Sequence, residues 1–202
     1  MNRFFMYMTA VTAVIFFCLG CGSEPDNDTV DIARALSGGE TACYSQADRP
    51  VPFKFPQDYG PHENFKTEWW YYTGNLKDPD GRHFGFQLTF FRQALACETP
   101  GGDSRWRTRQ LYFAHFAVTD TLNAVFYSAR RMNRGSLGIA GAAADPFRVW
   151  LDNWQAVGSA DESGSVTLQA RDQDTGGAGV FSIELSLARD KPMILQGMDG
   201  WS

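Results

Sequence analysis

A carboxylate stands at the head of four consecutive aromatic residues: Glu68 directly precedes Trp69, Trp70, Tyr71 and Tyr72. Side chains alternate between the two faces of a β-strand, so Glu68 shares one face with Trp70, while Trp69 shares the other with Tyr71. Burial among aromatic side chains raises the pKa of a carboxylic acid, so such a group can act as a general acid near neutral pH. Glu68 is therefore a candidate catalytic acid.

Two alternatives stay open for this stretch. Trp69, Trp70 and Tyr71 either line a small-molecule cavity or belong to a large core in which the polar tips of Trp and Tyr are hydrogen-bonded. Glu68 is either a pocket acid or the partner of an arginine, because an unpaired buried carboxylate is costly. The partner that we predict is Arg92, which belongs to the next strand-like run.

A second carboxylate in aromatic surroundings is Asp152, which lies between Trp150 and Trp154. If residues 147–157 form a single strand, these three side chains share one face. Trp150 and Trp154 are then further candidates for ligand binding, and Asp152 is a second candidate acid.

His115 is the candidate base, because it lies in the apolar run of residues 109–120. His62 and His83 are far from it in sequence, and no cysteine or histidine cluster has metal-ligand spacing, so we predict neither a metal nor a cofactor. The chain lacks the Gly-x-Ser-x-Gly elbow of many serine hydrolases. A net charge of -5 argues against nucleic-acid binding, which needs a basic surface.

The elements that position these residues are short β-strands, and no long helical period follows residue 50. Residues 51–55 form a further candidate strand, and the small residues of 134–146 predict a loop. We predict an all-β fold: an antiparallel meander that forms a lipocalin-like (calycin-type) barrel or one half of a two-domain β architecture. Turn residues separate the seven main runs, which predict strands over 67–76, 82–92, 109–120, 123–132, 147–157, 164–173 and 178–189.

The first 50 residues predict export and anchoring. An uncharged apolar run, Phe4 to Gly20, follows Arg3 and ends directly before Cys21, a pattern typical of lipoprotein signals. The alternative is a signal anchor that stays in the membrane. We predict residues 1–21 to be a lipoprotein-type signal segment with Cys21 as the lipidation site. Residues 22–50 are predicted to be a polar tether with a short helix over 29–36.

Export also affects the two cysteines that follow the signal, Cys43 and Cys97. Two cysteines in an oxidising compartment either pair or remain free thiols. We expect them to form a disulfide, which would close a loop of about 55 residues.

Three motifs carry a resemblance to a known family: "FPQDYGPHENFKTEWWYYTGNL", "GRHFGFQLTFFR" and "AHFAVTD". Together they closely resemble the AttH-like family, also called hydroxyneurosporene synthase-like, which includes carotenoid 1,2-hydratases. Many of its exported members are named predicted secreted hydrolases. The resemblance implies two lipocalin-like β-domains and chemistry that begins with protonation of an alkene. It implies that residues 51–202 are the N-terminal domain, cut short before a second domain that carries the main acid.

The resemblance implies an exported protein that binds or acts on an apolar prenyl-like, terpenoid-like or lipid molecule. The action would be acid-initiated hydration or cyclisation, or hydrolysis as the family naming suggests. The alternatives are a non-catalytic ligand-binding envelope lipoprotein, an accessory subunit of an exporter, and a structural remnant without activity. The expected partners are the apolar ligand, the membrane through the lipid anchor, and a second AttH-type domain. The expected location is the cell envelope, facing the periplasm or the exterior.

Overall fold

The computed structural model describes residues 41–99, 101–159, 164–197 and 200. The predicted signal segment, the lipidation site Cys21 and the short helix over 29–36 lie outside these residues. Within the part that is described, no helix is both long and apolar enough to cross a membrane.

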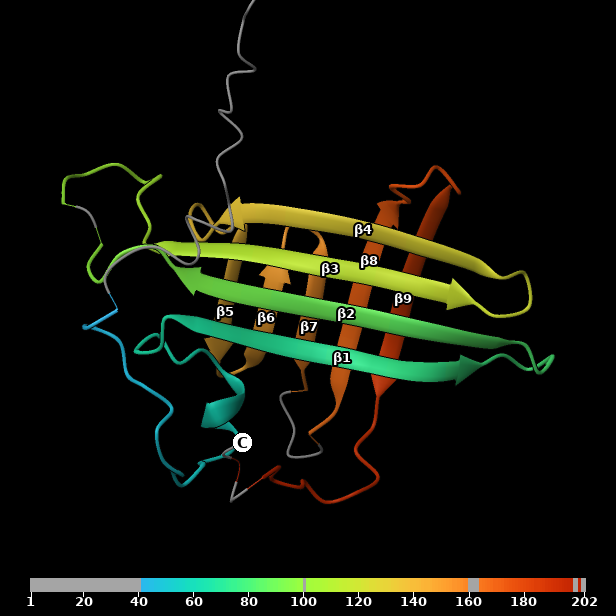
Figure 1. Ribbon diagram of the computed structural model, residues 1–202, viewed down its shortest axis with the longest axis horizontal. Coiled ribbons are helices and arrows are strands. Elements are labelled where there is room, and N and C mark those ends of the chain that lie inside the picture. Colours follow the sequence, from blue (N-terminus) through green and yellow to red (C-terminus); the bar gives the residue numbers. More distant parts are fainter. Residues whose placement is uncertain (1–40, 100, 160–163, 198–199, 201–202) are drawn as a thin grey trace, which may run out of the picture. The chain divides into compact units, whose positions relative to one another are not determined.

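The first sheet is a four-stranded antiparallel meander, built from the runs whose hydrophobic alternation is clearest (Figure 1). Phe84, Phe86, Leu88 and Phe90 point to one face of their strand, as the period of two predicts. The sheet order is sequential, and each strand pairs with the next: β1 (Thr67–Lys77), β2 (His83–Ala94), β3 (Gln110–Asp120) and β4 (Val125–Arg134).

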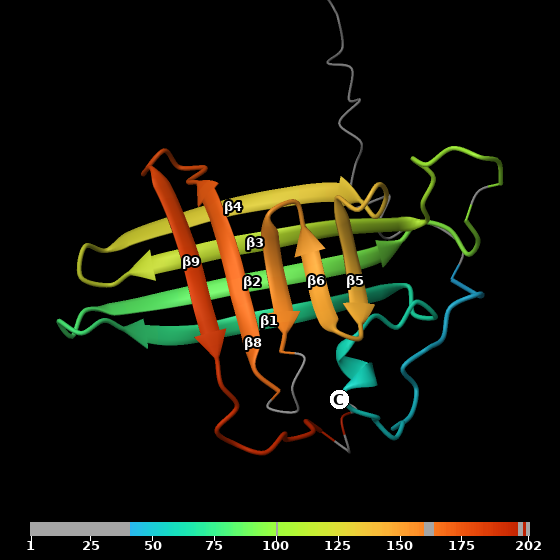
Figure 2. The ribbon, with the colours of Figure 1, turned by 180° about the vertical axis from the view of Figure 1, so that it is seen from behind.

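The second sheet is a five-stranded antiparallel meander whose strands run across those of the first (Figures 1 and 2). A short 3-10 helix, η1 (Gln57–Tyr59), precedes both sheets in the chain, and Figure 2 shows it beside the ends of β5 and β6. The strands of this sheet also follow sequence order: β5 (Ala140–Ala144), β6 (Phe147–Leu151), β7 (Trp154–Gly158), β8 (Val166–Gln173) and β9 (Val180–Leu187).

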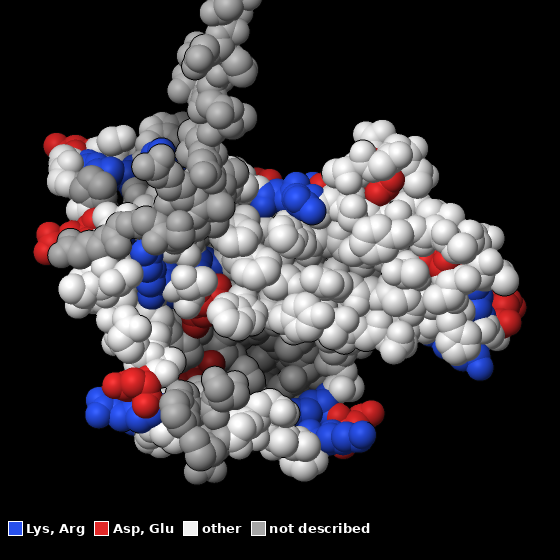
Figure 3. Space-filling view, viewed as in Figure 1, with Lys and Arg blue, Asp and Glu red and all other residues white. Residues whose placement is uncertain are grey.

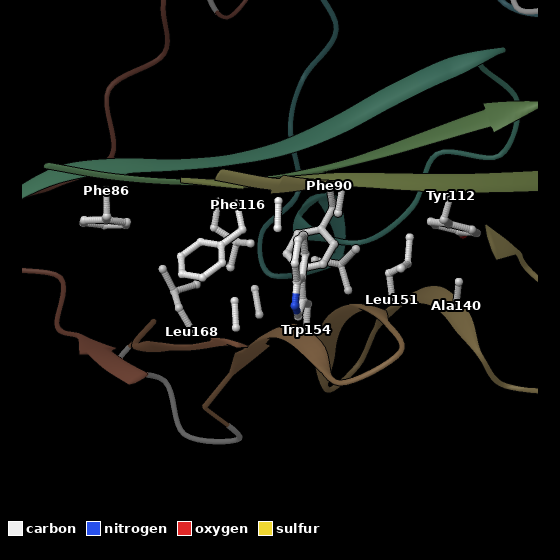
Figure 4. Packing of buried hydrophobic residues seen from close by; sticks show 14 of the residues in the cluster. Phe86, Phe90, Tyr112, Phe116, Ala140, Leu151, Trp154 and Leu168 are labelled. Carbon is white, nitrogen blue, oxygen red and sulfur yellow. The ribbon is translucent and has the colours of Figure 1, made fainter. Parts of the chain in front are cut away.

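The core fills the space between the two sheets (Figure 4). Phe90 and Phe116 come from the first sheet, and the rings of Phe116 and Trp154 meet edge to face at 5.6 Å. Leu151 and Leu168 complete the contact from the second sheet. The all-β, antiparallel prediction is confirmed. Among the described residues the two sheets do not join into a closed barrel, so the arrangement is an open two-layer sandwich.

Two local predictions are wrong. Residues 51–55 are not a strand, and the predicted loop over 134–146 contains β5. The loop prediction followed from the small residues of this segment, but the packing requires them. A Cβ atom on Gly141 would lie 2.6 Å from the ring of Trp150, so a larger residue there would collide with that ring.

The prediction of one strand over 147–157 is also wrong. Asp152 adopts a positive φ of 56°, which turns the chain back on itself. Leu151 and Trp154 become cross-strand partners of β6 and β7 and point into the core. Trp150 is set on the opposite face of the sheet, so the common face predicted for Trp150, Asp152 and Trp154 does not exist.

A disulfide joins Cys43 to Cys97, with a Cα–Cα distance of 5.9 Å. It links the segment before η1 to the connection between β2 and β3.

Candidate functional site

Side chains on the less exposed face of β1 contact each part of the candidate site. The alternating positions Glu68, Trp70 and Tyr72 are the less exposed residues of the strand. Each of the three meets a different feature: Glu68 a charged cluster, Trp70 the backbone of η1, and Tyr72 a cavity. One strand face therefore connects the acid of the sequence motif to a space that can hold a ligand.

Glu68 forms an ion pair with Arg92, as predicted. Arg92 Nε lies 3.1 Å from Glu68 Oε2, and the Arg92 side chain is 0% exposed. The guanidinium also donates to the backbone oxygens of His62 and Phe65, each at 2.9 Å, and to Gln110 Oε1 at 3.0 Å. Arg92 therefore ties β1, β3 and the segment before β1 together, and Glu68 supplies its counter-charge.

His62 lies between two carboxylates. Its Nδ1 is 2.6 Å from Glu68 Oε1, and its Nε2 is 3.2 Å from Asp58 Oδ1. Its backbone N–H also donates to the Glu68 carboxylate, at 3.1 and 3.0 Å. Burial alone would lower the pKa of His62, but the hydrogen bonds and charges of Glu68 and Asp58 outweigh burial and raise the pKa.

Trp70 holds η1 in position through a hydrogen bond. Its indole Nε1 donates to the backbone oxygen of Tyr59 at 2.9 Å. The Tyr59 ring packs against Phe55 at 4.7 Å and Phe147 at 6.3 Å. The Trp70 contact thus sets the position of an aromatic wall.

That wall borders a cavity of about 680 Å³, within the size range of small-molecule sites. Burial raises the pKa of the Tyr72 phenol, and within the described part of the chain its hydroxyl group has no hydrogen-bond partner. The Tyr72 hydroxyl group is therefore a polar group in a lining made mostly of apolar side chains. The main apolar lining residues are Phe55, Tyr59, Tyr72, Phe147, Val166 and Leu187.

The charged residues of the described cavity lining lie at exposed positions. Asp145 and Arg189 are the charged lining residues in the described chain, and both are exposed. Arg189 Nη1 lies 3.4 Å from the Tyr59 hydroxyl group. The cavity suits a molecule with an apolar body, and its polar groups can orient one end of that molecule.

Trp69, Tyr71 and His115 lie on the outer face of the first sheet and do not line this cavity. Trp69 is 62% exposed, and His115 packs edge-on against Phe91 at 5.4 Å. Burial, with a smaller contribution from Arg130, lowers the pKa of His115. The visible outer face of β1–β4 carries few charges (Figure 3), so it is an aromatic surface separate from the cavity.

Trp150, Asp152 and Trp154 also lie away from the cavity lining. The indole Nε1 of Trp150 donates to the backbone oxygen of Gly138 at 2.9 Å, and the indole Nε1 of Trp154 donates to the backbone oxygen of Arg171 at 3.1 Å. Asp152 lies in the β6–β7 turn, with Oδ2 3.7 Å from Arg131 Nη1. The structure brings the two carboxylate candidates, Glu68 and Asp152, to different places.

Sequence reasoning missed the roles of Asp58, Tyr59 and His62. All three fall in the motif "FPQDYGPHENF", just before the aromatic stretch. The sequence places Asp58 four residues before His62 and Glu68 six residues after it, which was the available signal for a cluster. Only the folded loop shows that both ring nitrogens of His62 face carboxylates. Among the described residues, no group of three or more His, Cys, Asp or Glu side chains could hold a metal ion.

The comparisons with known proteins agree with this architecture. The AttH-like family model matches residues 46–202. The chain is similar to the crystal structure of a protein described as an AttH from Nitrosomonas europaea, with 31% identity and a TM-score of 0.59. That match covers 75% of this chain and 44% of the other, so the chain spans less than half the length of that protein. No curated protein matches. The chain belongs to the AttH-like family.

Proposed function

We propose that this protein binds an apolar small molecule, of prenyl-like, terpenoid-like or lipid character, in the cavity beside η1. The observation that carries the proposal is the cavity itself, with its aromatic and aliphatic walls and the free hydroxyl group of Tyr72. Membership of the AttH-like family supports the proposal, because the resemblance to that family implies a ligand of this kind.

Binding is favoured over catalysis by the position of the acids. Acid-initiated hydration or cyclisation needs a carboxylic acid held neutral in an apolar site. The acidic side chain in the described lining is Asp145, which is exposed. Glu68 is not a lining residue, and both of its oxygens accept hydrogen bonds from the protein. An enzymatic role, including the hydrolysis that the family naming suggests, would need an acid from elsewhere, such as a second AttH-type domain.

We further propose that the protein is an envelope lipoprotein, anchored through Cys21 and facing the periplasm or the exterior. The apolar run before Cys21 supports this. The disulfide between Cys43 and Cys97 is of the kind found in oxidising compartments. A membrane-anchored cavity would receive its apolar ligand directly at a lipid surface.

The binding proposal can be tested with N-phenyl-1-naphthylamine, a neutral fluorescent apolar probe. Val166 lines the cavity, so Val166→Trp fills it with a larger side chain. We expect the affinity for the probe to fall about tenfold or more, the factor that corresponds to a loss of ~1.4 kcal/mol. Fluorescence titration measures this loss.

The matched control is Val180→Trp, the same substitution at a position that is 61% exposed and outside the cavity. Trp69→Ala is a second control, because it removes an exposed aromatic ring from the outer face. Both controls should bind the probe as the parent does. Unchanged binding in Val166→Trp, or loss in Trp69→Ala alone, would show that the probe does not use the cavity.

A further inference from the structure

The hydrogen bonding of His62 requires a particular protonation state. A neutral imidazole has one N–H donor and one acceptor nitrogen, whereas the imidazolium has two donors. Both ring nitrogens of His62 face carboxylate oxygens, Nδ1 toward Glu68 at 2.6 Å and Nε2 toward Asp58 at 3.2 Å. Carboxylates accept hydrogen bonds and do not donate them, so only the doubly protonated ring satisfies both contacts.

This bridge joins two parts of the site. Asp58 belongs to η1 and directly precedes Tyr59, which lines the cavity. Glu68 lies on β1 and is fixed by the buried Arg92. His62 thus connects a cavity wall to the rigid sheet, in parallel with the hydrogen bond from Trp70 to Tyr59.

We propose that Asp58, His62 and Glu68 form a pH-dependent latch, which holds the cavity wall of residues 55–62 against β1 when His62 is doubly protonated and loosens it when His62 loses a proton. The latch rests on the proposed function in so far as it regulates ligand binding. Its effect on the wall does not depend on any ligand.

The direction of the pH effect follows from the raised pKa of His62. A group whose pKa is higher in the folded state stabilises that state below its unfolded pKa, which is about 6.5 for histidine. This stabilisation is lost as the pH rises through the raised, folded pKa. The latch is therefore closed in mildly acidic solution and open in alkaline solution.

The other charged groups near the bridge favour the same state. The hydrogen bond from the backbone N–H of Lys54 is the main cause of the lowered pKa of Asp58, which keeps that side chain an acceptor. From β2, Arg92 pairs with Glu68 and donates to the backbone oxygen of His62. The neighbouring Glu63 is engaged with Arg109 at 3.0 Å. The carboxylates that face the imidazole are thus Asp58 and Glu68.

A measurement without ligand tests the latch itself. The backbone N–H groups of Tyr59, Gly60 and His62 are hydrogen-bonded within this segment or to Glu68. Their hydrogen-exchange protection, corrected for intrinsic rates, should fall about two- to fivefold between about pH 6 and pH 9, a change equal to ~0.4–1 kcal/mol. His62→Gln cannot titrate, so its protection should be low and constant. Exchange that keeps the parent's pH dependence in His62→Gln would overturn the proposal.

Asp58→Asn gives a sharper test, because it should hold the latch closed. The asparagine amide donates a hydrogen bond to neutral Nε2, while Nδ1–H still donates to Glu68. We expect high protection at both pH values, and tight binding of N-phenyl-1-naphthylamine at both. A variant that still loosens at alkaline pH would contradict the latch. His83→Gln and His115→Gln are matched controls, since they remove the other histidines without touching the bridge.

The two proposals fail in different ways. If the probe ignores Val166→Trp but exchange follows the predicted pH dependence, the cavity is not the ligand site and the latch stands as a property of the segment. If Val166→Trp abolishes binding but probe affinity and exchange in the parent do not vary with pH, the binding site stands and the latch is wrong.

Discussion

Arg92 is a buried charged residue whose guanidinium has several polar partners. Its side chain is 0% exposed and contacts an acid, an amide and two backbone oxygens. A buried ion pair is weak support for net stability, but removing one partner leaves the other charge uncompensated. Glu68 therefore has a structural role that accounts for its place at the head of the aromatic stretch.

At the residue scale, we predict that Glu68→Gln destabilises the protein by about 3–5 kcal/mol, because the charge of Arg92 loses its counter-charge in a buried site. Urea unfolding followed by fluorescence measures the loss. The matched control is Glu63→Gln. Glu63 forms an ion pair with Arg109, and 58% of the Glu63 side chain is exposed. Exposed pairs contribute about 0–1 kcal/mol, so the control should unfold close to the parent.

A Glu68→Gln variant that unfolds like its parent would contradict this assignment, because Arg92 would then not need the charge of Glu68. Loss of probe binding does not decide the question, since Glu68 is also one arm of the proposed latch.

The strand β1 shows how one element serves two surfaces. Its aromatic residues alternate between the core and the exterior, so Trp70 contacts η1 and the core while Trp69 is 62% exposed. Two neighbouring residues of the same type thus have unrelated roles. The cause is the period of two along a strand, which sends consecutive side chains to opposite faces.

At the element scale, we predict that Trp70→Ala lowers the free energy of unfolding by about 2–4 kcal/mol, because it leaves a cavity beneath η1 and removes a hydrogen bond. Trp69→Ala should change stability by no more than ~0.5 kcal/mol, as is usual for surface positions. Equal losses in the two variants, measured by urea unfolding, would mean that the outer face is covered as fully as the inner one.

Contacts between the sheets hold the whole molecule together beyond the apolar core. Arg131 of β4 donates to Asp172 of β8 at 2.8 Å and lies over the ring of Trp154. Asp174 accepts a hydrogen bond from the backbone N–H of Ser128 at 2.7 Å. Backbone hydrogen bonds from Ala178 and Ser128 lower the pKa of Asp174. These polar contacts link the first sheet to β8 and to the segment that follows it.

At the scale of the whole molecule, we predict that replacing Cys43 and Cys97 together by serine costs about 4 kcal/mol, because the unfolded chain gains the freedom of a long open loop. The closed loop has a sequence separation of 54. Thermal unfolding with and without reducing agent measures this. Reduction should lower the melting temperature of the parent and leave the double variant unchanged. A parent insensitive to reduction would show that the loop contributes little.

The elements with strong hydrophobic alternation could be predicted from the residues alone. The hairpin of β1 and β2, that of β3 and β4, and that of β8 and β9 could all be predicted, because period-two hydrophobicity and turn residues are local signals. The pair of Glu68 and Arg92 followed from the same logic, since the hairpin register places them opposite each other. The family was also predictable from the motifs around them.

The remaining features depend on long-range packing. The strand β5 and the β6–β7 turn depend on contacts with Trp150 and on the positive φ of Asp152, neither of which leaves a periodic pattern. The position of His62 between two carboxylates depends on how a loop folds over a strand, and loop paths are set by distant packing partners. The cavity has the same origin: its walls come from η1, β1 and all five strands β5–β9 of the second sheet, which are separated along the chain and meet only when the two sheets pack.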